Sequence, residues 1–143
     1  MAVNFSADPT QVNTNCKVVQ TKVVKLTYAN FGVTPVDALV ARIPANATIV
    51  GIRYYNQTKL AGNSISAATL SIGTTSGSTN IVNAFDVFTT VGTMAYLSPI
   101  ATIMHNLGAY LGSWTSLDFY ARGTATTGDP TSGTIYLMID YVQ

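Results

Sequence analysis

The residues after Pro44 constrain the fold of this chain more than any other stretch. Proline lacks the N–H that a sheet ladder uses, so Pro44 belongs just before a strand or on a sheet edge. The next residues are mostly β-branched or aromatic, and successive side chains of a strand point to opposite faces. The alternation predicts one face with Thr48, Val50, Ile52 and Tyr54, and another with Ile49, Gly51, Arg53 and Tyr55.

A turn and a second strand follow this run. Ala61-Gly62-Asn63-Ser64 has the residues of a turn, because Gly and Asn tolerate positive φ. In residues 69–73, Leu70 and Ile72 share one face and polar residues take the other. We therefore expect a central hairpin of two antiparallel strands within a sandwich.

The last third of the chain repeats the alternation. Apolar residues recur at every second position in residues 117–122 and again in residues 135–142. Both faces of the final strand are fairly apolar, as in a central strand or a strand at a subunit interface. The six acidic residues are all Asp, and Glu, which favours helices, is absent. These features predict an all-β protein.

Three segments are less regular. The apolar phase slips at Val23 and Val24, which predicts a bulge or a crossing between sheets. Residues 36–43 are expected to form a strand in which Leu39 shares a face with Ala41 and Ile43. Residues 81–92 place apolar side chains at helical spacing, so we expect a short helical turn or an irregular loop there. The residues with that spacing are Ile81, Val82, Phe85 and Phe88.

The number of strands and turns indicates the fold class. One or two short strands are expected between residues 94 and 111. In total we count about eight short strands separated by frequent turn signals. The expected fold is an antiparallel β-sandwich of jelly-roll type.

The beginning of the chain differs from the rest. Residues 1–15 are polar and are broken at Asp8-Pro9, which predicts a loosely ordered N-terminal arm. Residues 16–143 are then expected to form a single β-sandwich domain. Apolar residues on the arm could pack locally or contact a neighbouring molecule, and the candidates for such assembly contacts are Val3, Phe5, Pro9 and Val12.

Charge and hydropathy argue against two classes of partner, nucleic acid and membranes. Charged residues make up 9% of the chain and the formal net charge is +1. Nucleic-acid binding needs a basic surface, and the nearest approach to one is Lys17, Lys22 and Lys25, which we interpret as solvated lysines that protect a strand edge. No apolar run approaches the roughly 20 residues of a membrane helix, and the first residues do not resemble a signal peptide. We expect neither nucleic acid nor a membrane as partner.

The low charge has a second implication. The chain is 48% hydrophobic, and a soluble monomer usually keeps more charge on its surface. Ser, Thr, Asn and Gly can cover part of that deficit. The rest of the surface is expected to be buried against other subunits, which predicts a homo-oligomer or a piece of a larger assembly.

Residues for catalysis are sparse. His105 is the one histidine, Cys16 is the one cysteine, and the acidic residues are isolated in the sequence. Metal sites need clusters of such residues. A nucleophilic triad would have to use His105, yet no Gly-x-Ser-x-Gly motif accompanies it. We therefore expect no metal, no cofactor and no enzymatic activity, and a structural role for His105.

The aromatic residues allow one binding hypothesis. Sugars pack their apolar faces on aromatic rings, and many lectins are jelly rolls. The alternative is that these rings fill the core or an interface, with their polar tips reaching a partner. The candidate stacking residues are Tyr54, Tyr55, Tyr110 and Trp114, with Tyr120 as a further member.

Strand and turn signatures over residues 36–142 resemble a known family. They are the Pro-led strand Ile43–Ile52, the strand ending Leu70-Ser71-Ile72-Gly73-Thr74, the segment Arg122-Gly123-Thr124-Ala125, the loop Gly128–Gly133 and the final Asp140-Tyr141. Together they resemble the small jelly-roll virion proteins of tailed bacteriophages, which comprise the capsid decoration, or cement, proteins and their relatives in necks and tails.

The resemblance implies a function and a partner. It implies a non-enzymatic protein, made in the bacterial host cytoplasm, that sits on the capsid surface of the virion. There it would bind the major capsid protein, as a trimer by preference or as a dimer, and bridge capsomers. Two alternatives stay open: a neck, tail or fibre subunit of the same fold, and a carbohydrate-binding module.

Overall fold

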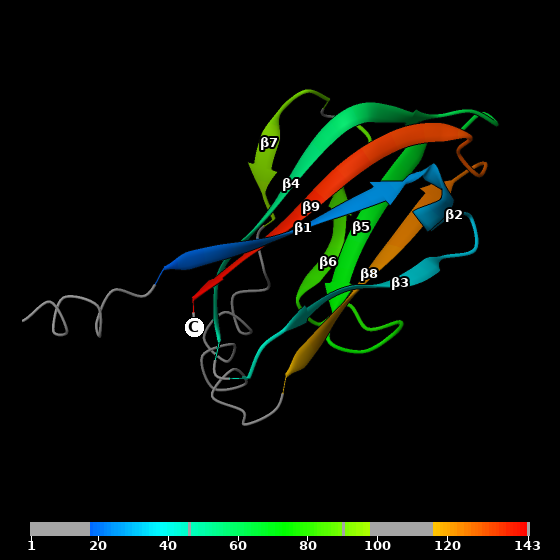
Figure 1. The fold of residues 1–143 in the computed structure, drawn as a ribbon. Coiled ribbons are helices and arrows are strands. Elements are labelled where there is room, and N and C mark those ends of the chain that lie inside the picture. The colour runs from blue at the N-terminus through cyan, green and yellow to red at the C-terminus, as the bar shows by residue number, and fades with distance from the viewer. Residues whose placement is uncertain (1–17, 46, 90, 98–115, 143) are drawn as a thin grey trace, which may run out of the picture.

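A computed structural model describes residues 18–142 except residues 46, 90 and 98–115. The described residues form two sheets that pack face to face (Figure 1). The strands are β1 (Val19–Thr27), β2 (Phe31–Gly32), β3 (Val36–Ile43), β4 (Thr48–Ala61), β5 (Ala67–Gly73), β6 (Val82–Asp86), β7 (Met94–Tyr96), β8 (Leu117–Thr126) and β9 (Ser132–Val142), and one 3₁₀ turn, η1 (Tyr28–Asn30), follows β1. The expected β-sandwich of jelly-roll type is confirmed.

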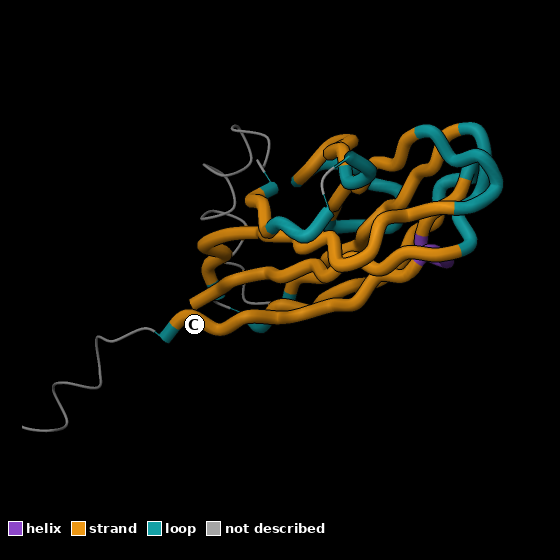
Figure 2. The backbone as a smooth tube through the Cα atoms, turned by 90° about the horizontal axis from the view of Figure 1, so that it is seen from above, coloured by secondary structure: helices purple, strands orange, loops and turns teal. Residues whose placement is uncertain are grey.

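Each sheet is assembled from strands that are distant in sequence. Sheet A has the order β1-β9-β4-β7, and all its pairs are antiparallel. Sheet B has the order β2-β8-β5-β6, and β3 pairs antiparallel with β8 on the same side as the short parallel strand β2. Viewed from above, the two sheets form two layers joined by loops at the ends (Figure 2).

The core lies between the two layers. In β9 the expected alternation is present, with Ile135, Leu137 and Ile139 fully buried. Tyr54 of β4 meets Phe85 of β6 edge to face, with ring centroids 5.2 Å apart, and so joins sheet A to sheet B. Other fully buried side chains come from both sheets: Ile43, Ile52, Leu60, Leu70, Ile72 and Phe119.

The expected central hairpin is wrong. The turn at Gly62–Ser64 exists, and its backbone N–H of Ile65 donates to the carbonyl of Gly62 at 3.1 Å. The two strands beside it do not pair with each other, because β4 pairs with β9 in sheet A while β5 pairs with β8 in sheet B. The connection therefore crosses from one layer of the sandwich to the other.

For residues 81–92 the sequence predicts a short helical turn or an irregular loop. The helical turn is wrong, because Val82–Asp86 forms strand β6, while residues 87–89, 91 and 92 are irregular as the second alternative has it. Val82 is opposite Ile72 and Phe85 is opposite Leu70, with a register shift between them. Ala84 has φ +47°, which is typical of a bulge. The extra residue places the core-facing side chains of Val82 and Phe85 three positions apart, and that spacing imitates a helix. One short strand expected after residue 94 is confirmed as β7, and residues 98–111 lie outside the described part.

Bulges also change the expected faces of β3 and β4. In β3 the register shifts around Val40, so Val40 is buried and Leu39 is exposed on the outside of sheet B. In β4 the register shifts between Ile49 and Gly51, so the expected strict alternation is broken there. The bulge expected in β1 is absent, because all nine of its residues pair with β9 in continuous register.

Candidate functional site

Many of the candidate residues from the sequence lie outside the described part of the chain. This applies to the four arm residues proposed as assembly contacts and to two of the four proposed stacking aromatics. It also applies to the single cysteine and the single histidine. These residues are Val3, Phe5, Pro9, Val12, Tyr110, Trp114, Cys16 and His105.

The described tyrosines of the sugar-binding hypothesis do not gather in one place. Tyr54 has 1% of its surface exposed and belongs to the core, so its ring cannot stack on a sugar. Tyr55 is half-buried on the outside of sheet A, opposite Met94. Tyr120 is half-buried on the outside of sheet B, opposite Leu39. The fold thus separates three tyrosines that the sugar-binding hypothesis groups together.

The outer face of sheet A carries a row of apolar side chains. Strand register places Val19 and Val23 of β1 on this face together with Met138 of β9. At the opposite edge of the sheet, Met94 and Tyr96 of β7 are exposed, and Tyr96 has 72% of its surface accessible. We call this surface the outer A face; it consists of Val19, Thr21, Val23, Lys25, Arg53, Tyr55, Met94, Tyr96, Tyr136, Met138 and Asp140.

One ion pair lies at the centre of the outer A face. Arg53 donates from Nε to Asp140 Oδ2 at 2.7 Å and from Nη2 to Asp140 Oδ1 at 2.8 Å. The hydroxyl of Thr21 donates to the same Oδ1 at 2.6 Å. The hydrogen bonds from Arg53 hold the pKa of Asp140 below its ordinary value, against the opposing effect of burial. Both charges are mutually neutralised, which leaves the face largely apolar in character.

The outer face of sheet B is more polar. Arg42 of β3 forms a two-point ion pair with Asp118 of β8, at 2.6 and 2.9 Å. Arg122 of β8 approaches Asp37 of β3 at 3.6 Å and donates to the carbonyl of Gly77 at 2.9 Å. The outer face of sheet B therefore carries two charge pairs along the edge formed by β3, whereas the outer A face carries one pair at its centre.

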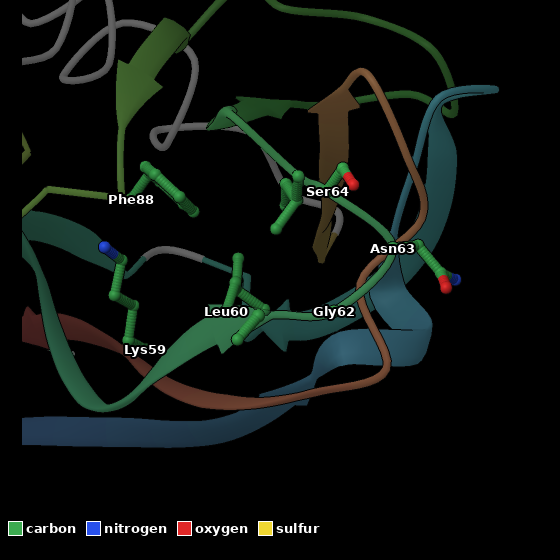
Figure 3. A pocket seen from close by; sticks show the side chains of 8 residues that line it. Lys59, Leu60, Gly62, Asn63, Ser64 and Phe88 are labelled. Carbon is green, nitrogen blue, oxygen red and sulfur yellow. The ribbon is translucent and has the colours of Figure 1, made fainter.

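A cleft of about 290 Å³ lies where β4 ends. Its walls include Leu60, the turn Gly62–Ser64 and Phe88 (Figure 3). The Nζ of Lys59 lies 4.4 Å from the centroid of the Phe88 ring, a cation–π distance. Because this ammonium group covers one face of the ring, the cleft offers little aromatic surface for a sugar.

In residues 18–142, leaving aside the gaps named above, no three His, Cys, Asp or Glu side chains come close enough to hold a metal ion. Within that same described part, no helix is long and apolar enough to cross a membrane. Two surface features remain in the described part of the chain: the outer A face, and the edge of β1 that no described strand covers, which we call the free edge of β1.

Comparisons with known proteins bear on the fold. No protein-family model and no curated protein sequence matches the chain. Among solved structures, a chain of the cyanophage Pam1 capsid asymmetric unit is similar, with a TM-score of 0.54, 15% identity, and coverage of 88% of this chain and 85% of that one. The capsid of Ralstonia phage GP4 also has a similar chain, with a TM-score of 0.49, 15% identity, and coverage of 90% and 85%.

A third structure is the acid-stable capsid of Helicobacter pylori bacteriophage KHP30, with a TM-score of 0.49, 7% identity, and coverage of 90% and 94%. The likeness to the Pam1 chain extends over most of both chains, so it concerns the whole sandwich and not one motif. At 15% identity it establishes architecture and not shared residues. This chain therefore has the β-sandwich fold that occurs in a phage capsid.

Proposed function

We propose that this chain is a structural protein of a phage virion, and specifically a decoration, or cement, protein on the outside of the capsid. In this role it binds the major capsid protein through the outer A face and bridges neighbouring capsomers. The observation that supports the proposal most directly is the fold, which is similar to that of a chain of the cyanophage Pam1 capsid asymmetric unit.

The difference between the two outer faces supports the choice of docking surface. Protein interfaces are enriched in aromatic residues and Met and are depleted in charged residues at their centre. Tyr96 and Met94 are exposed on the outer A face, and its central charges, Arg53 and Asp140, are already paired. Docking at the centre of this face would bury apolar surface together with a charge pair that is already satisfied.

The proposed mechanism is additive. Each contact between a decoration protein and the shell can be modest, because an oligomer binds several capsomers at once and each linked contact strengthens the others. The low charge of the chain fits a protein whose surface is largely covered in an assembly. We accordingly propose a homo-oligomer in the assembled virion.

The test uses heads and tails of the phage that encodes the chain. Heads that lack the protein are mixed with increasing amounts of purified full-length chain and pelleted, and the bound fraction is measured. Saturable binding to heads, together with a higher temperature for release of packaged DNA, is expected. Protein that stays in the supernatant with heads but pellets with tails would replace the proposal with a neck, tail or fibre role.

A carbohydrate-binding module is the competing function from another class. Burial of Tyr54 and the position of Lys59 over Phe88 count against it in the described part of the chain. A glycan array with the same purified protein distinguishes the two functions. Binding of a defined glycan, with no binding to heads, would overturn the capsid proposal.

A further inference from the structure

The free edge of β1 differs from the other sheet edges in the described part of the chain. Natural β-proteins shorten or interrupt exposed edges to avoid pairing with other molecules. Here β7 has three residues, β3 is interrupted by the register shift around Val40, and β6 is interrupted by the bulge at Ala84. By contrast, β1 has nine residues, and its ladder with β9 has no shift.

This edge is chemically ready to pair. In an antiparallel ladder every second residue of an edge strand directs its N–H and C=O away from the sheet. No strand among the described residues pairs with β1 on the side away from β9 (Figure 1). On the outer A face, β1 also exposes Val19 and Val23, with 56% and 60% of their surfaces accessible. A strand added at this edge would satisfy the backbone groups and cover apolar surface.

We propose that β1 pairs antiparallel with β1 of a second copy of this chain, around a two-fold axis at Val23. The two A sheets then form one continuous sheet. Such a contact is self-complementary and closes at a dimer. The inference deepens the oligomeric part of the proposed function and rests on it.

The lysines of β1 exclude some of the alternative registers. Like charges directly opposite each other destabilise a strand pair. With the axis at Val23, Val23 meets its own counterpart and Lys22 meets Val24. An axis at Lys22 or at Lys25 would place that lysine opposite itself. Among axes near the middle of β1, the lysines thus leave those at Val23 and Val24. Val23 is the middle residue of the strand, so an axis there pairs all nine residues of β1 with the second copy, whereas an axis at Val24 pairs fewer.

Charge complementarity supports a second copy as the occupant. In the proposed register Lys25 of one copy is opposite Thr21 of the other. Thr21 donates its hydroxyl to Asp140, which lies on the neighbouring strand β9. The long side chain of Lys25 would therefore point along the same face toward a carboxylate of the other copy. An isologous dimer makes this contact twice.

The symmetry of the proposed dimer is compatible with docking to a capsid shell. In a continuous antiparallel sheet the two-fold axis that relates the central strands is perpendicular to the sheet. Both outer A faces then look in the same direction. The dimer would present one wide apolar surface to the capsid, twice the size of that of one copy.

The first test is the mass of the purified full-length chain by light scattering and sedimentation. We expect a dimer. Val23→Lys places two ammonium groups next to each other at the axis and should weaken dimerisation by about tenfold or more. The matched control is Val19→Lys on the same strand and face, because Val19 would be opposite Thr27. It should remain dimeric.

The second test locates the axis by cross-linking. In a background with Cys16→Ser, Val23→Cys should form an intermolecular disulfide readily, because paired residues have Cα atoms about 4.5–5.5 Å apart. In the control Val19→Cys the cysteine is similarly exposed but lies far from its symmetry mate, so this variant should not form the disulfide. Both positions are exposed, and circular dichroism checks that each variant is folded.

Several results would overturn the inference. A monomer or a trimer in solution, a dimer that Val23→Lys leaves intact, or equal cross-linking from both cysteine variants each contradicts pairing at β1. The head-binding experiment is independent of these measurements. Saturable binding of a monomeric protein to heads would remove the β1 dimer and leave the proposed capsid role standing.

Discussion

Arg53 of β4 and Asp140 of β9 form a two-point ion pair that crosses the centre of sheet A, with donor–acceptor distances of 2.7 and 2.8 Å. Their side chains are 23% and 12% exposed. The second two-point pair in the described residues, Arg42 with Asp118, is 66% and 26% exposed. The chain therefore contains the same chemical pair in a covered and in an open setting.

This contrast predicts different costs of mutation. Asp140→Asn removes the charge that Arg53 faces and weakens the acceptor for Thr21, and it should lower the free energy of unfolding by about 2 kcal/mol. Asp118→Asn is the matched control and should have a clearly smaller effect, because solvent screens an exposed pair. Chemical denaturation of both variants measures the difference. Equal losses would show that burial does not distinguish the pairs.

The same pair predicts a dependence of stability on acid. Hydrogen bonds from Arg53 lower the pKa of Asp140 in the folded protein. The unfolded chain therefore binds the proton more readily, since an unperturbed Asp has a pKa of about 3.9. The stabilisation from Asp140 is fully present above that pH and is lost as the pH falls through the lower folded-state pKa.

We expect the free energy of unfolding to fall below about pH 4, and to fall less steeply for Asp140→Asn than for the natural chain. Part of the slope should persist in the variant, because the pKa values of Asp86 and Asp118 are also lowered. Denaturation curves at a series of pH values measure both slopes. Parallel curves for the two proteins would contradict the assignment to Asp140.

The bulge in β6 predicts a stabilising substitution. Ala84 has φ +47°, a left-handed conformation that costs an L-residue about 1 kcal/mol and costs Gly little. Its N–H donates to the hydroxyl of the buried Ser71 at 2.8 Å, which holds the bulge in place. Ala84→Gly should raise the free energy of unfolding by about 0.5–1 kcal/mol.

Ala61→Gly is the control for that substitution. Ala61 is exposed near the end of β4 and does not have positive φ. Glycine there should lower stability by about 0.5–1 kcal/mol, because only the unfolded chain gains freedom. Thermal unfolding of the pair should thus give shifts of opposite sign. A loss of stability in both variants would contradict the strained bulge.

The proposed docking surface predicts an asymmetry between the two outer faces. Tyr96→Ser on the outer A face should weaken binding to heads by about tenfold, since tyrosines commonly contribute much of an interface's affinity. Leu39→Ser removes an exposed apolar side chain from the outside of sheet B and should leave binding unchanged. Cosedimentation with heads measures both. A larger loss from Leu39→Ser would assign docking to sheet B.

The sequence alone determined the class of fold and the orientation of regular strands. In β9 the buried faces of Ile135, Leu137 and Ile139 follow from alternation, because a strand's side-chain period of two is a local property of the backbone. The turn at Gly62–Ser64 was predictable for the same reason, since it depends on the φ values that its own residues tolerate. A single strand or turn carries this information within a few residues.

Bulges and exposed apolar residues could not be told apart in the sequence. Two adjacent valines in β1 suggested a bulge, yet the ladder is continuous and Val23 is simply exposed. In β3 a real bulge at Val40 exposes Leu39, and in β6 the bulge at Ala84 produced a helix-like spacing. In each case an apolar side chain out of phase has two explanations, and only the partner strand decides between them.

Tertiary structure also decided which strands are neighbours and what lies on one surface. The strands beside the Gly62–Ser64 turn belong to different sheets, because β4 pairs with β9 and β5 pairs with β8, and both partners are far along the chain. Arg53 and Asp140 are 87 positions apart in sequence. Pairing across such distances depends on the combined burial of all the strands, so no local pattern could reveal the outer A face or the free edge of β1.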